Sequence, residues 1–207
     1  MKIKDKNKVK DAGKSKPIDM TLYTPHNKLR LAGLNSDTSP VLTKQIAEEL
    51  RSFFPIIQKE SIDWDLLYSI DQHGISMRTL IGRGEEELNT PCILAVKVGQ
   101  GNVIGAYMSE APKLRKGYYG NGSCFLWKFN DSTKHLSLYP SSGENEHYLL
   151  SEGDGLALGG GDKGFGIWIS EDLCRGHTIN CATFKNEPLS PDGDFDIIGL
   201  ELWAIRM

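Results

Sequence analysis

A short run late in the chain carries two thiols and an imidazole at a spacing that could support chemistry. Cys174, His177 and Cys181 are ligand types at intervals compatible with a zinc site. A structural zinc needs four ligands, and His135 or His147 would have to fold back to supply the fourth. The alternative is two loop thiols and a surface imidazole, and we predict that no metal or other cofactor is bound.

The same two thiols permit a second chemistry, the reduction of peroxides. A peroxidatic cysteine must be a thiolate, which a helix N-terminus or neighbouring cations stabilise. Arg175 and His177 are the cationic candidates nearby, and Glu171 and Asp172 oppose them. An enzyme that detoxifies reactive oxygen species through these thiols, or through a metal held by them and His177, is therefore the alternative hypothesis.

Gly159, Gly161 and Gly164 match the spacing of a dinucleotide-binding loop. That chemistry requires a helix after the loop, because the helix N-terminus holds the pyrophosphate. Here the run FGIWIS follows, which reads as a strand, so we interpret the glycines as a tight turn between two strands. The sequence contains neither a P-loop nor a G-x-S-x-G nucleophile elbow.

One carboxylate, Glu201, lies inside the apolar run LELW. A carboxylate in a buried strand must be paired, hydrogen-bonded or neutral. The alternative is a position at the edge or end of a sheet, where the side chain reaches solvent. We therefore expect Glu201 to be either a structural or a functional carboxylate.

The elements that would position these residues are mostly short strands. Turn signals recur at the short spacing typical of an antiparallel sandwich, and strands do not alternate with long helices. The hairpin at 92–108 is apolar on both faces, so we place it centrally in a sheet. About nine strands are expected, at 64–70, 92–98, 103–108, 123–129, 135–139, 148–150, 155–160, 165–170 and 195–205. Within the first of these, Trp64, Leu66, Tyr68 and Ile70 should share one face.

Two helices are predicted before the central hairpin. The first begins with Ser39 as N-cap and Pro40 at the first helical position, and it ends at Pro55. The second, over 77–81, follows a Ser76 cap and stops at Gly82. The apolar face of the first helix should consist of Leu42, Ile46, Leu50 and Phe53.

The order of these segments resembles the TLDc domain, the module shared by the oxidation-resistance proteins. The pieces that match its C-terminal half are, in order, GDGLALGGG, FGIWIS, EDLCRG, TFKNEPLS and LELW. The resemblance implies an α+β fold, a two-sheet antiparallel β-sandwich core with a few flanking helices, over residues 39–207. Residues 1–38 would be a disordered basic tail and an irregular lead-in. Glu201 matches the acidic residue of the family's E-x-W ending.

Length and composition suit one globular domain, since 207 residues with 39% hydrophobic and 25% charged residues can bury a core. No apolar run approaches the ~20 residues of a membrane span, and the N-terminus lacks the apolar segment of a secretory signal. Four cysteines are few for a disulfide-built secreted chain, and Cys92 and Cys124 lie in apolar runs typical of a core. We expect a cytoplasmic protein.

Positive charge is concentrated at the N-terminus. Residues 1–16 hold seven Lys and two Asp, and the net charge of the whole chain is −3. No Arg or aromatic residue interrupts these lysines, so a solvated arm is favoured over a contact with nucleic acid. We expect the removal of residues 1–16 to leave the fold intact.

The resemblance also implies a function without catalytic residues. TLDc proteins are linked to resistance to oxidative stress and to binding the vacuolar-type proton ATPase, so that pump is the expected partner. Binding to the pump would bring the chain to vacuolar or endolysosomal membranes without membrane insertion. The chain would then regulate the assembly or activity of the pump. Docking residues should lie on exposed turns held by the rigid sheets. The candidates are Asp71, His73, Asp162, Lys163, Asp172, Arg175 and His177.

Overall fold

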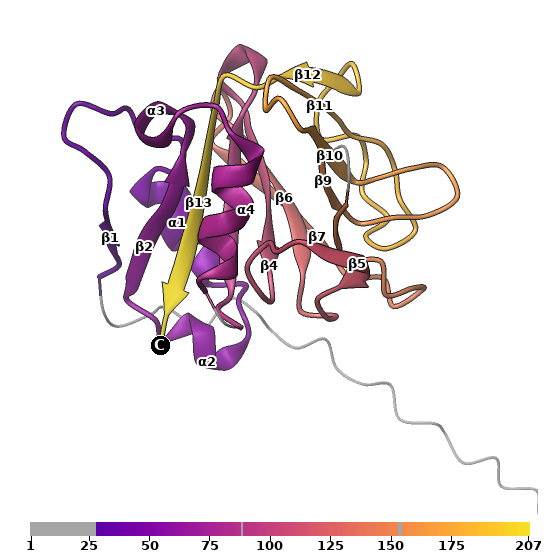
Figure 1. Ribbon diagram of the computed structural model, residues 1–207, viewed down its shortest axis with the longest axis horizontal. Coiled ribbons are helices and arrows are strands. Elements are labelled where there is room, and N and C mark those ends of the chain that lie inside the picture. Colours follow the sequence, from indigo (N-terminus) through magenta and orange to yellow (C-terminus); the bar gives the residue numbers. More distant parts are fainter. Residues whose placement is uncertain (1–27, 88, 153–154) are drawn as a thin grey trace, which may run out of the picture.

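Two β-sheets stacked face to face make up the protein (Figure 1), whose computed structural model describes residues 28–87, 89–152 and 155–207. The seven-stranded sheet has the order β1 (Arg30–Ala32), β2 (Asp63–Ser69), β13 (Gly199–Arg206), β3 (Cys92–Lys97), β4 (Val103–Met108), β6 (Phe125–Asn130) and β7 (His135–Pro140). The six-stranded sheet has the order β12 (Asp194–Asp196), β11 (Arg175–His177), β10 (Ile167–Ser170), β9 (Gly155–Leu158), β8 (Leu149–Ser151) and β5 (Arg115–Tyr119). Neighbours pair antiparallel except β1 with β2.

The main core fills the space between the two sheets. Period-two alternation sends every second side chain of a strand to this layer. Leu94, Leu126 and Leu202 enter it from the seven-stranded sheet, and Leu156 and Ile169 enter it from the six-stranded sheet. The predicted fold class, a two-sheet β-sandwich with flanking helices, is confirmed, and the 92–108 hairpin lies in the interior of its sheet as β3 and β4.

Four short helices flank the sheets in the described residues: α1 (Lys44–Arg51), α2 (Ile56–Lys59), α3 (Ile70–His73) and α4 (Met77–Glu85). The first covers the outer face of the seven-stranded sheet, where Ile46 and Leu50 pack with Trp64, Trp127 and Trp203. The last contributes Met77 and Leu80 to the core between the sheets, so α1 and α4 lie on opposite sides of β13 (Figure 1).

The first helix begins later than the sequence suggested. Thr43, not Ser39, is the N-cap, and its side chain accepts a hydrogen bond from the backbone N–H of Ile46. The preceding residues are held in a non-helical segment by contacts with β13. The helix ends at Arg51, before the predicted apolar face is complete, so Phe53 is 40% exposed and Phe54 is buried in its place.

A β-bulge in β2 overturns the prediction that its alternate residues share one face. Leu202 pairs with Tyr68 but Trp203 pairs with Leu66, so Leu67 is an extra residue in the ladder. Trp64 therefore packs in the layer under α1, whereas Tyr68 packs between the sheets.

The predicted strand at 195–205 is two strands in different sheets. The backbone N–H of Ile197 donates to the carbonyl of Cys174, immediately before β11 of the six-stranded sheet, and that of Ile198 donates to the carbonyl of Lys97 in the seven-stranded sheet. The chain thus crosses from β12 to β13 between these two residues. An apolar run has no periodicity that reveals such a crossing.

The remaining differences concern short elements. Thirteen strands are present in the described residues rather than about nine, because β1, β5 and β11 were not expected and the predicted strand at 195–205 divides into β12 and β13. β1 lies in the lead-in expected to be irregular, while the basic tail at 1–16 is outside the described residues. Helix α4 begins after its Ser76 cap as predicted but continues through Gly82 to Glu85.

Candidate functional site

One end of the six-stranded sheet carries a row of aromatic and charged side chains on its outer face. The strand register aligns Trp168 of β10 with His177 of β11, and His177 with Asp194 of β12. The Trp168 and His177 rings are stacked, with centroids 5.1 Å apart and planes inclined by 22°. The neighbouring residues along each strand, Ile169 and Phe195 among them, point inward to the core.

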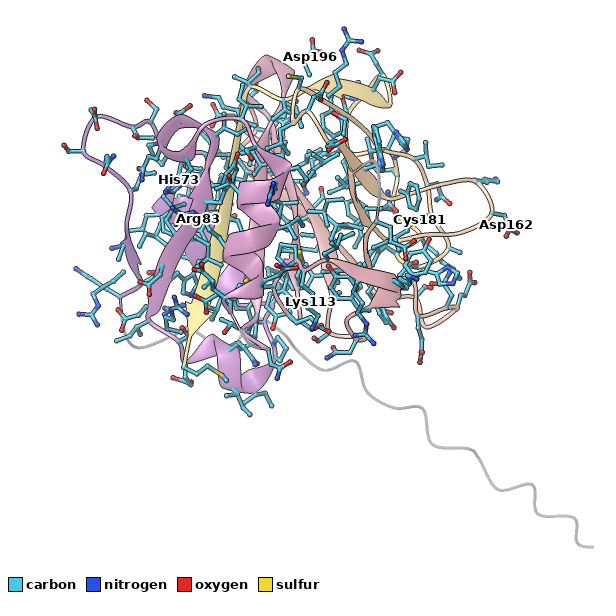
Figure 2. The ribbon with its side chains drawn as sticks, viewed as in Figure 1. His73, Arg83, Lys113, Asp162, Cys181 and Asp196 are labelled. Atoms are coloured by element: carbon cyan, nitrogen blue, oxygen red, sulfur yellow. The ribbon has the colours of Figure 1, made fainter. Side chains whose placement is uncertain are left out.

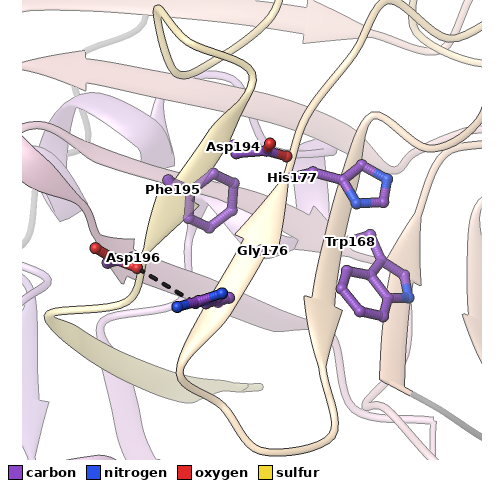
Figure 3. Close-up of a pocket in the computed structure, with 7 residues that line it drawn as sticks. Trp168, Gly176, His177, Asp194, Phe195 and Asp196 are labelled. Atoms are coloured by element: carbon purple, nitrogen blue, oxygen red, sulfur yellow. Dashed lines mark ion pairs between the residues drawn. The ribbon is translucent and has the colours of Figure 1, made fainter.

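A second row lies beside the first and is charged. Arg175 pairs in register with Asp196, and its Nε lies 3.8 Å from an Asp196 carboxylate oxygen. The side chains are 81% and 87% exposed, so this ion pair is screened by water and contributes little to stability. Figure 3 shows the two rows around a hollow of about 460 Å³, which we call the β10–β12 hollow.

The loop before β11 is shaped by Asp172. Its carboxylate accepts hydrogen bonds from the Ser170 hydroxyl and from the backbone N–H of Cys174, 2.9 Å away. The Ser170 hydrogen bond, followed by that of Cys174, holds the pKa of Asp172 below its usual range. The predicted candidates Asp172, Arg175 and His177 are therefore close together, with Asp172 forming the turn that leads into β11.

The other predicted docking residues lie elsewhere. Asp162 and Lys163 line a separate hollow of about 430 Å³, in which Lys185 and Glu144 form an ion pair of 2.6 Å. The turn at 161–164 is confirmed by a hydrogen bond from the N–H of Gly164 to the carbonyl of Gly161. Figure 2 labels Asp162 at the opposite side of the molecule from His73.

Asp71 and His73 belong to α3, not to a simple turn. Asp71 is exposed, whereas His73 is partly buried and its Nδ1 accepts a hydrogen bond of 2.9 Å from the backbone N–H of Ser69. Its ring also stacks on Tyr68 at 5.7 Å. Burial, with repulsion from Arg83, lowers the pKa of His73. His73 thus has a local structural role that the sequence did not reveal.

The thiols of Cys174 and Cys181 differ in solvent exposure. Cys174 is exposed, while Cys181 is 1% exposed and its Sγ donates to Asn186 Oδ1 at 3.2 Å. Burial raises the pKa of the Cys181 thiol, and likewise those of Cys92 and Cys124. In the described part of the chain, no three His, Cys, Asp or Glu side chains are grouped as metal ligands.

Glu201 is 1% exposed and lies on the face of β13 that α1 covers. Its two carboxylate oxygens accept hydrogen bonds from the backbone N–H groups of Val41, at 2.8 Å, and Leu42, at 2.9 Å. The indole Nε1 of Trp203 donates a third, also of 2.9 Å. The buried carboxylate is therefore hydrogen-bonded by three N–H groups.

Of the residues that line the β10–β12 hollow, the sequence indicated only Arg175 and His177. The sequence pattern indicates only a strand for Trp168, and it places Asp194 beside and Asp196 inside the predicted 195–205 strand. The only local signal is the alternation in Asp194-Phe195-Asp196, which exposes both carboxylates once Phe195 is buried. Their proximity to Arg175 depends on pairing between β11 and β12.

Comparison with known proteins gives the family. The TLDc domain model matches residues 35–206. Oxidation resistance protein 1 of Yarrowia lipolytica is 36% identical over 91% of this chain and 84% of its own length. The proteins of the same name from Podospora anserina and Kluyveromyces lactis are both 32% identical, over 86% and 91% of this chain and 64% and 81% of their own lengths. The chain belongs to the TLDc domain family.

Proposed function

We propose that this chain is a non-enzymatic binding module that contributes to resistance to oxidative stress. The names of its relatives, oxidation resistance protein 1, support the stress role. The observation that carries the binding role is the β10–β12 hollow. There, Trp168, Arg175, His177, Asp194 and Asp196 project from a strand-paired scaffold, where they form few bonds with the protein itself.

The buried polar side chains, in contrast, form hydrogen bonds within the protein. Thr183 Oγ1 accepts from the N–H of Gly160, and Asn186 Nδ2 donates to the carbonyl of Ile179. Together with the bonds of Glu201, these contacts tie loops and strands together. A thiol-dependent mechanism gains no support from Cys181, because burial disfavours its thiolate.

The proposed partner is the vacuolar-type proton ATPase, with the chain regulating its assembly or activity. This part rests on the TLDc resemblance. Partner binding would place the chain in the cytoplasm, at vacuolar or endolysosomal membranes. None of the helices in the described residues has the length and apolar character needed to cross a bilayer.

Capture from cell extract tests this proposal. We expect the immobilised protein to retain pump subunits, and Trp168→Ala combined with Asp172→Asn to retain fewer, because the two changes remove an aromatic contact surface and an exposed carboxylate. Asn keeps an acceptor for the Cys174 N–H, so the loop should survive the change. Lys134→Glu, which breaks an exposed ion pair with Asp131, is the control for altered surface charge.

Thermal unfolding of each variant must match that of the wild type for the comparison to hold. If the wild-type protein retains no pump subunit under any nutrient or nucleotide condition, the proposed partner is wrong. If both variants retain subunits equally, the β10–β12 hollow is not the docking surface.

A further inference from the structure

The edge of the six-stranded sheet presents unpaired backbone groups. β12 is its outermost strand, and bonds at each end fix its orientation: Thr178 N–H donates to Gly193, and Ile197 N–H donates to Cys174. In an antiparallel ladder, successive residues direct their N–H and C=O groups to opposite sides. Those of Asp194 and Asp196 therefore point away from β11, toward the open edge.

A second hollow lies along that edge. Its volume is about 320 Å³, and it is lined by Gly99, Pro191, Asp192 and Ile198 together with the three residues of β12. Ile198 is 58% exposed, which is unusual for a large aliphatic side chain next to a strand edge. β12 thus separates two hollows, one on the face of the sheet and one beside its edge.

The charge around β12 is negative. Asp192, Asp194 and Asp196 follow one another at every second position, and all three are exposed. Glu171 and Asp172 add two more exposed carboxylates in the loop before β11. Arg175 is the cation within the β10–β12 hollow, and it lies 3.8 Å from Asp196. Such a surface attracts cationic groups and repels nucleic acid and anionic membranes.

We propose that β12 binds an extended, lysine- or arginine-rich segment of a partner protein by strand addition. The partner's backbone pairs with the free N–H and C=O groups of Asp194 and Asp196. Its alternate side chains then fall on two faces: cationic ones beside the two carboxylates, and apolar ones toward Ile198. This inference rests on the proposed function as a binding module, and it specifies the chemistry of the segment that is bound.

A short acidic edge strand has another explanation, since natural proteins use both features to prevent edge-to-edge aggregation. That explanation predicts no binding. It also gives no reason for the exposed Ile198 or for a hollow on each side of the strand. A binding measurement therefore separates the two.

The probe is a synthetic peptide of alternating lysine and valine, with blocked termini, titrated into the full chain by calorimetry or fluorescence anisotropy. We expect binding that weakens with added salt. A peptide with glutamate in place of lysine should not bind. A peptide N-methylated at the amides on one edge should bind about tenfold more weakly or worse, because it cannot pair with β12. Equal binding of the methylated and unmodified peptides overturns strand addition.

Two variants at one position separate backbone from charge. Asp194→Asn removes a carboxylate, and Asp194→Pro also removes the outward N–H without touching the bonds to β11. We expect Asp194→Pro to bind the peptide more weakly than Asp194→Asn, and both more weakly than the wild type. Asp131→Lys, in the exposed turn between β6 and β7, is the charge control and should bind normally.

Other occupants give different results. If the chain binds the peptide only after residues 1–16 are removed, its own lysine-rich segment occupies the edge and the proposal is wrong. If the chain sediments as a dimer and the peptide dissociates that dimer, the β12 edge is occupied by a second copy of the chain, and the proposal is also wrong. Peptide binding without pump capture would reject the proposed partner but keep this inference. If the peptide does not bind and the Asp194→Pro protein still captures the pump, the proposed partner is kept and strand addition at β12 is rejected.

Discussion

The indole Nε1 of Trp203 lies 2.9 Å from a carboxylate oxygen of Glu201, two residues earlier on β13. The period of two places both side chains on the face that α1 covers. The same carboxylate receives the backbone N–H groups of Val41 and Leu42, immediately before the Thr43 N-cap. One buried side chain thus fastens the entry of α1 to the centre of the seven-stranded sheet.

Glu201→Gln should destabilise the fold while preserving its shape. The amide offers one acceptor oxygen, so its NH₂ faces a backbone or indole N–H that loses its partner. An unsatisfied buried donor costs about 1–3 kcal/mol. Since about 1 kcal/mol shifts the melting temperature of a domain this size by about 2–4 °C, a fall of several degrees is expected in a thermal scan.

Glu187→Gln is the matched control for that change. Glu187 accepts from Lys128 and Tyr139 at a 61% exposed position, where an ion pair contributes about 0–1 kcal/mol. A Glu201→Gln protein that melts like the wild type and yet loses all cellular function would make Glu201 a functional site instead.

His73 should make stability depend on pH. Its pKa is lower in the folded protein than in the unfolded chain, so the unfolded chain binds the proton more readily. The stability that it contributes is complete above the unfolded-state pKa of about 6.5 and is lost as the pH falls toward the folded value. Protonation also conflicts with the hydrogen bond that Nδ1 accepts from Ser69.

The test compares denaturant unfolding near neutral pH with unfolding about two pH units lower. His73→Asn keeps a side-chain acceptor but does not titrate, so its loss of stability on acidification should be smaller than that of the wild type. His135→Asn, at an exposed position on β7, should behave like the wild type. An identical pH response in all three proteins would remove His73 from this role.

The four thiols should differ sharply in reactivity. Cys174 is exposed, whereas Cys92, Cys124 and Cys181 are buried and have raised pKa values. A thiol reagent should label one cysteine quickly in the native protein, and Cys174→Ser should abolish that fast phase. Fast labelling of a second thiol would show that the core opens readily.

Protection from peroxide should not require the thiols. Cells with Cys174→Ser combined with Cys181→Ser should survive peroxide as well as wild-type cells at equal protein abundance. Ser at 181 retains a donor for Asn186, so the loop should remain in place. Complete loss of protection at normal abundance would favour a thiol-dependent enzyme.

Two glycines of α4 should respond oppositely to alanine. A Cβ at Gly82 meets no atom within 4 Å, so Gly82→Ala should stabilise the helix by about 0.5–1 kcal/mol. A Cβ at Gly84 would lie 2.0 Å from the carbonyl oxygen of Pro112, so Gly84→Ala should lower the melting temperature. Equal shifts for both variants would contradict the packing of α4 against the Pro112 segment.

The sequence by itself determined what depends on neighbours along the chain. The Ser76 cap, the glycine turn at 161–164 and the central hairpin at 92–108 each follow from residues a few positions apart. The alternation of Phe125, Trp127 and Phe129 can likewise be seen in the sequence, and all three pack in the layer under α1. The resemblance to the TLDc family could also be recognised from the sequence, because it rests on short motifs and on their order along the chain.

Only the tertiary structure decided what depends on distant partners. The start of α1 is fixed by Glu201, which lies 160 positions from Val41, and no local cap signal competes with those buried hydrogen bonds. The bulge in β2 exists because β13 pairs with it in shifted register. The β10–β12 hollow forms because β12 leaves the apolar 195–205 run to pair with β11. Period and propensity act over one strand or turn, whereas these features come from pairing between strands and from burial of polar groups that must find partners.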